Sequence, residues 1–94
     1  MTDQEYAAII YRKIFLVTDD NDAPTQGIMK AISTLGPREQ FVLEKYYRHG
    51  KTLEQVGKEI GLSRSWVGQI VNKAILKLRH PLRSRDIILN PAYM

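Results

Sequence analysis

The stretch Leu53–Asn72, LEQVGKEIGLSRSWVGQIVN, contains the most informative pattern in this chain. Immediately before it, Thr52 stands three residues ahead of Gln55, which is the pattern of a capping box at the start of a helix. We expect that helix over residues 53–60. Gly61 then supplies a residue that tolerates positive φ, as a sharp exit from the helix requires.

A second helix is expected after this turn. Ser63 is a favoured N-cap residue, and the helix should run from Arg64 to about Arg79, before Pro81. Gly57 provides a small residue in the first helix where the second packs closely. Two helices joined by such a turn indicate a helix-turn-helix. On the glycine pattern alone, a helical hairpin that serves only stability is an equal alternative.

The two faces of the second helix separate these alternatives. At about 100° per residue, its buried stripe comprises Val67, Ile70, Val71, Ala74 and Leu78. The opposite face carries the hydrogen-bonding residues Ser65, Gln69, Asn72 and Lys73. Glutamine and asparagine can pair bidentately with adenine, serine with several base edges, and Arg64 with guanine or a phosphate. This pattern favours a helix that enters the major groove of double-stranded DNA.

The rest of the chain also has helical periodicity. We expect further helices over about residues 3–17, 26–34 and 37–47, with no strand-like alternation, so the fold class is all-α with about five helices. The first has the apolar stripe Tyr6, Ile9, Ile10, Ile14 and Val17. The expected divisions are an N-terminal helix and linker over 1–25, a helix-turn-helix domain over 26–85 and a tail over 86–94.

Composition and charge limit the classes of function. The 94 residues suit one small core, and 44% hydrophobic and 26% charged residues are typical of a folded chain. Residues 1–36 carry three basic and five acidic groups, whereas residues 37–94 carry eleven basic and five acidic groups, so the C-terminal part would attract a polyanion. The chain has no cysteine and no nucleophile or phosphate-loop motif. We expect no enzyme, cofactor or metal, and a cytoplasmic protein.

Thr52–Ser84, TLEQVGKEIGLSRSWVGQIVNKAILKLRHPLRS, resembles region 4 of the bacterial sigma-70 family, the module that recognises the promoter minus-35 element. Upstream, Leu35–Tyr47, LGPREQFVLEKYY, is similar to the start of the same region. The similarity extends over residues 28–85, and the closing KLRHPLRS makes it more specific than a general helix-turn-helix pattern.

The resemblance implies roles in DNA binding. Arg64, Ser65 and Gln69 fall on positions that meet bases or adjacent phosphates of the minus-35 element. Lys73, one turn further along, is expected to contact a phosphate. The first turn of the supporting helix, whose amides can hold a backbone phosphate, contains Thr52 and Leu53.

The resemblance also implies contacts with RNA polymerase. A basic tail that suits DNA or an acidic polymerase surface comprises Arg79, Arg83 and Arg85. Phe41 and Leu43 are candidates for the groove that receives the polymerase β-flap, with core packing as the alternative for each.

Several features depart from the family pattern. Ser65 stands where an acidic residue usually accepts from a cytosine amino group, Gly68 has no side chain to reach a phosphate, and Trp66 is expected to pack on the flank of the helix. Nothing resembles region 2, which clamps the core enzyme. We therefore expect one part of a split sigma factor with a region 2-bearing partner subunit, a phage or mobile-element regulator built on region 4, or a fragment of a longer protein. There are two alternatives to a DNA-reading module that acts with RNA polymerase. One is a module that binds polymerase or an anti-sigma partner without reading DNA, and the other is a free-standing repressor that dimerises through the helix over residues 3–17.

Overall fold

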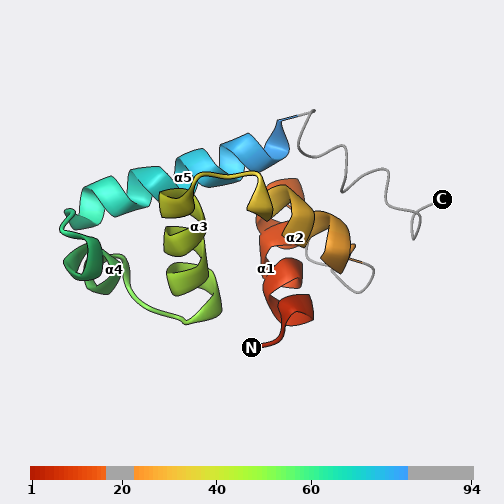
Figure 1. Ribbon diagram of the computed structural model, residues 1–94, viewed down its shortest axis with the longest axis horizontal. Coiled ribbons are helices and arrows are strands. Elements are labelled where there is room, and N and C mark those ends of the chain that lie inside the picture. Colours follow the sequence, from red (N-terminus) through yellow and green to blue (C-terminus); the bar gives the residue numbers. More distant parts are fainter. Residues whose placement is uncertain (17–22, 81–94) are drawn as a thin grey trace.

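The computed structural model describes residues 1–16 and 23–80, and within these ranges the chain is all-helical, as the sequence predicts. The elements are α1 (Asp3–Phe15), α2 (Thr25–Ser33), α3 (Pro37–Leu43), the π-helical segment η1 (Glu44–Arg48), α4 (Leu53–Ile60) and α5 (Arg64–Arg79). Figure 1 shows α5 crossing above α3 and α1, with α4 below its N-terminal end. No helix in these ranges combines the length and apolar character needed to cross a bilayer.

Side-chain caps fix the starts of α4 and α5. The Thr52 hydroxyl accepts from the Gln55 amide at 3.1 Å, and the Gln55 side chain accepts from the Thr52 amide at 2.9 Å, so the predicted capping box is present. Ser63 caps α5 by accepting from the Trp66 amide at 3.2 Å. These bonds satisfy amides that the first turn of a helix leaves without a partner.

The turn between α4 and α5 depends on two glycines. Gly61 adopts the left-handed conformation with φ of 72°, as predicted. A Cβ on Gly57 would collide with the backbone carbonyl of Leu62, and it would lie 3.4 Å from Cγ2 of Val67. The close approach at Gly57 therefore comes mainly from the backbone of the turn, whereas the sequence predicted it from the second helix.

The third helix differs from the continuous helix expected over 37–47. After Leu43 the chain widens into η1, where the His49 amide donates to the Glu44 carbonyl five residues earlier, at 3.0 Å. Gly50 follows with φ of 68°, a left-handed conformation that glycine adopts without strain at the end of a helix. The segment brings Arg48 against α1, where its guanidinium lies 2.8 Å from the Asp3 carboxylate and donates to the Met1 carbonyl at 3.2 Å.

All five α-helices contribute to the hydrophobic core, although η1 has no fully buried residue. From α1 the buried residues are Tyr6, Ala7, Ile10 and Ile14, while Ile9 is half-buried and Val17 lies outside the described residues. The predicted stripe of α1 is thus occupied by the chain's own core. Tyr6, Ile10 and Ile14, buried in this core, are unavailable as a dimer interface in this fold.

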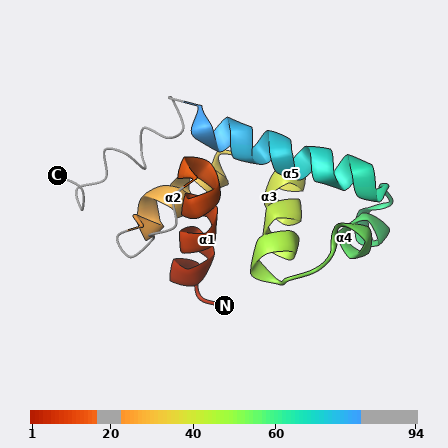
Figure 2. The ribbon, with the colours of Figure 1, turned by 180° about the vertical axis from the view of Figure 1, so that it is seen from behind.

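The C-terminal half of α5 ties the N-terminal helix to the rest of the fold. Nε of Arg79 donates to the Ile14 carbonyl at 2.9 Å, and a terminal nitrogen donates to the Lys13 carbonyl at 2.8 Å. The Lys77 ammonium forms an ion pair with the Glu39 carboxylate of α3, at a distance of 2.9 Å. Figure 2, from behind, shows α1 and α3 both reaching α5. Because these bonds join opposite ends of the described chain, α1 is part of the same folded body as α3 and α5.

Candidate nucleic-acid interface

One face of α5 presents polar side chains to solvent over nearly three turns. The exposed residues of this face are Arg64, Ser65, Gln69, Asn72 and Lys73. Within residues 1–16 and 23–80, none of their side chains forms a hydrogen bond or ion pair. The opposite side of α5 is anchored by Val67, Val71, Ala74, Ile75 and Leu78. The structure therefore places these predicted DNA-binding residues on one exposed face, where their polar groups have no partner among the described residues.

The first turn of α4 lies against this part of α5. Leu53 is half-buried, and its Cδ1 is 3.6 Å from the position that a Cβ on Gly68 would occupy. Thr52 is exposed at the N-cap, and its hydroxyl already serves the Gln55 amide. Leu53 thus packs beside α5 at the N-terminal end of α4, where Thr52 is exposed to solvent.

Of the three arginines in the predicted basic tail, the structure describes Arg79. Arg79 is exposed, but its guanidinium bonds the last carbonyls of α1, so part of its donor capacity is already used. Its DNA contact stays a prediction. Arg83 and Arg85 lie outside the described residues.

A family model supports this assignment of the helix-turn-helix. The model described as "Sigma-70, region 4" matches residues 31–80, which is more than half of the chain. The chain belongs to the sigma-70 region 4 family. This is a family of non-enzymatic DNA-binding domains that act in transcription initiation with RNA polymerase.

A curated relative agrees with the family model. RNA polymerase sigma factor SigA of Clostridium acetobutylicum is 36% identical over 86 residues, a match that covers 78% of this chain and 23% of the relative. The chain therefore spans about a quarter of the length of that relative. No solved structure matches the chain significantly.

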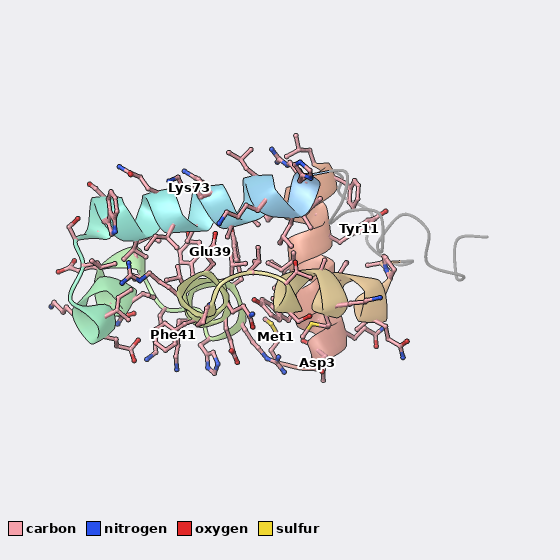
Figure 3. All side chains as sticks on the ribbon, turned by 45° about the horizontal axis from the view of Figure 1, so that its top comes forward. Met1, Asp3, Tyr11, Glu39, Phe41 and Lys73 are labelled. Carbon is pink, nitrogen blue, oxygen red and sulfur yellow. The ribbon has the colours of Figure 1, made fainter. Side chains whose placement is uncertain are left out.

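The two region 4 residues considered for polymerase contact have different environments. Leu43 is fully buried and packs in the core, so it has no surface to offer a partner. Phe41 is half-buried, and the Lys45 ammonium lies 5.4 Å from the centre of its ring. In Figure 3, Phe41 and Lys73 lie toward opposite edges of the molecule. A partner at Phe41 would thus leave the polar face of α5 open.

Two further side chains of α5 differ from the sequence prediction. Trp66, expected to pack, is 47% exposed at the start of α5. Ile75 is buried on α5, although the predicted stripe omitted it, because at about 80° from Val67 it lies on the edge of that stripe. Within the described parts of the chain, no group of three or more metal-ligating side chains comes together.

Proposed function

We propose that this region 4 domain binds double-stranded DNA sequence-specifically, at a promoter-like element, and acts with RNA polymerase in transcription initiation or its regulation. The observation that carries the proposal is the polar face of α5, which is held by the α4 turn and forms no side-chain hydrogen bond or ion pair within residues 1–16 and 23–80. A region 2-bearing partner subunit would supply the clamp on the core enzyme.

Within the proposed complex, α5 enters the major groove. Gln69 and Asn72 are the base-reading residues, because their amides can form two hydrogen bonds with adenine. Arg64 and Ser65, in the first turn, contact bases or the adjoining phosphates. Lys73 holds a phosphate and contributes salt-dependent affinity without reading sequence.

The first experiment compares two α5 variants on two kinds of DNA. The preferred duplex is selected from a random pool with the unmodified protein, and affinities are then measured by fluorescence anisotropy. Gln69→Ala should cost about 1–3 kcal/mol on the preferred duplex and little on random DNA. Lys73→Ala should weaken both duplexes by a similar factor. Equal losses on both duplexes for the Gln69 variant would rule out its base-reading role.

Contact with RNA polymerase is a separate part of the proposal. Phe41 supports it, because this half-buried aromatic side chain lies away from Lys73. Binding of the whole chain to core polymerase without DNA should be saturable, and Phe41→Ala should weaken it while DNA affinity is unchanged. Polymerase binding without any preferred duplex would favour the alternative of a protein-interaction module that does not read DNA.

A further inference from the structure

An open groove of about 860 Å³ lies between the C-terminal half of α1 and the segment that joins η1 to α4. Arg12 and Lys13 line it from α1, and Tyr46, Lys51 and Thr52 line it from the other side. A smaller hollow of about 400 Å³ shares Tyr46 and Thr52 with it. Arg64, at the start of α5, also lines that hollow. The groove and the hollow together therefore extend from α1 to the start of α5.

The charges of this groove suit a polyanion. Its ionisable lining, within the described residues, consists of the three cations Arg12, Lys13 and Lys51 together with two tyrosines. Burial and the neighbouring Tyr46 raise the pKa of Tyr47, so this tyrosine stays neutral at physiological pH. The Lys51 ammonium also lies 3.1 Å from the Glu59 carboxylate. Because a solvent-exposed ion pair contributes little, a phosphate group can replace Glu59 as the partner of Lys51.

Three residues of α5 lie on the side of the helix that faces the start of α4 and the end of α1. At about 100° per residue, Gly68, Asn72 and Arg79 fall within about 40° of one another around the helix. Gly68 faces Leu53 at the start of α4, and Arg79 bonds the end of α1. Asn72, exposed between them, therefore points over the side where α4 and α1 border the groove.

We propose that this groove binds the sugar–phosphate backbone of the same duplex whose major groove receives α5, with Arg12, Lys13 and Lys51 as phosphate contacts. The inference rests on the proposed function and extends it. The N-terminal helix then enlarges the DNA-binding surface beyond the helix-turn-helix, and its basic residues add affinity at phosphates beside the bases that Asn72 and Gln69 contact.

A charge-matched pair of double variants tests this extension. Arg12→Gln/Lys13→Gln removes two cations from the groove, whereas Lys30→Gln/Lys45→Gln removes two cations that do not line it. Lys45 instead lies over the Phe41 ring. Affinity for the preferred duplex is measured by anisotropy over a series of salt concentrations, after thermal melting has established that each variant is folded.

The groove variant should lower the slope of log affinity against log salt by about 0.9 for each phosphate that the protein no longer neutralises, and so by about 1–2 in all. The control should leave the slope nearly unchanged. Lys51→Gln, as an independent variant, should lower the slope by about 1. Ethylation interference should identify phosphates that matter to the unmodified protein and no longer matter to Arg12→Gln/Lys13→Gln.

Equal salt slopes and equal affinities for the groove and control double variants would overturn the inference, as would a normal interference pattern in the groove variant. Failure of the proposed function has a different result, since the unmodified protein would then prefer no duplex at all. If the groove instead binds an acidic protein segment, the groove and control variants would have equal salt slopes and affinities, and both would keep the normal preference for the selected duplex.

Discussion

The two halves of α5 are held in place by different means. From Arg64 to Ile70 the one fully buried residue is Val67, and the position of the helix depends on the α4 turn and the Ser63 cap. The C-terminal half buries four residues, Val71, Ala74, Ile75 and Leu78. It also bonds α1 and α3 through Arg79 and Lys77.

This difference explains how a small domain keeps polar side chains available for a partner. A recognition helix needs a rigid backbone and unoccupied side chains at the same end. Here the backbone of the turn supplies rigidity to the N-terminal half, while apolar burial that would occupy side chains is concentrated in the other half. Substitutions at the two ends should therefore act through different mechanisms.

The largest effect is expected where the C-terminal half of α5 is buried. Leu78 is fully buried, so Leu78→Ala should lower the free energy of unfolding by about 2–5 kcal/mol, because it removes apolar packing and leaves a residual cavity. Leu76 is 60% exposed on the same helix, and Leu76→Ala should change it by less than about 0.5 kcal/mol. Urea titration followed by circular dichroism measures both; similar losses would show that α5 is not anchored at this end.

A smaller loss is expected at the turn. Gly57→Ala places a methyl group against the Leu62 carbonyl, and because backbone cannot move aside as a side chain can, it should cost about 1–3 kcal/mol. The variant should also bind the selected duplex more weakly when still folded, because the start of α5 is displaced. Unchanged stability and binding would mean that the turn is looser than the structure indicates.

The link between α5 and α1 should contribute less. Arg79→Gln removes charged donors from the Ile14 and Lys13 carbonyls and should cost about 1–2 kcal/mol in thermal or urea unfolding. Arg38→Gln, at an exposed position in α3, is the matched control and should cost almost nothing. If the two variants were equally stable, the Arg79 contacts would be without energetic consequence.

The smallest effect should be a gain. A Cβ on Gly68 meets only Leu53 Cδ1 at 3.6 Å, an ordinary contact, and Gly68 lies inside α5 with helical backbone angles. Gly68→Ala should therefore raise the free energy of unfolding by about 0.5–1 kcal/mol, because alanine loses less conformational freedom in a helix. A loss of stability would show that α4 and α5 pack more tightly here than at an ordinary contact.

Features encoded by neighbouring residues were predictable from the sequence. Thr52 with Gln55, Gly61 and Ser63 each act within one turn of their own position, so the helix-turn-helix and the polar face containing Gln69 follow from local patterns. Exposure of that face also follows from helical periodicity. The DNA roles of these residues remain predictions.

Other features depend on contacts that no local pattern encodes. The π-helical turn at Glu44–Arg48 has no distinctive residue pattern, so the sequence predicted an ordinary helix there. Arg79 looks like part of a basic tail until the end of α1 is placed beside it. Leu43 likewise suits a partner groove or a core equally well until its burial is known.

The bond from Arg79 to Ile14 has a consequence for the order of folding. It spans 65 residues of chain, whereas α4 and α5 follow one another directly. Contacts close in sequence form with a smaller loss of chain entropy than distant ones. During synthesis α1 therefore leaves the ribosome before α5, and it can be bonded by Arg79 only after α5 has been made, so its apolar stripe stays incompletely covered until then.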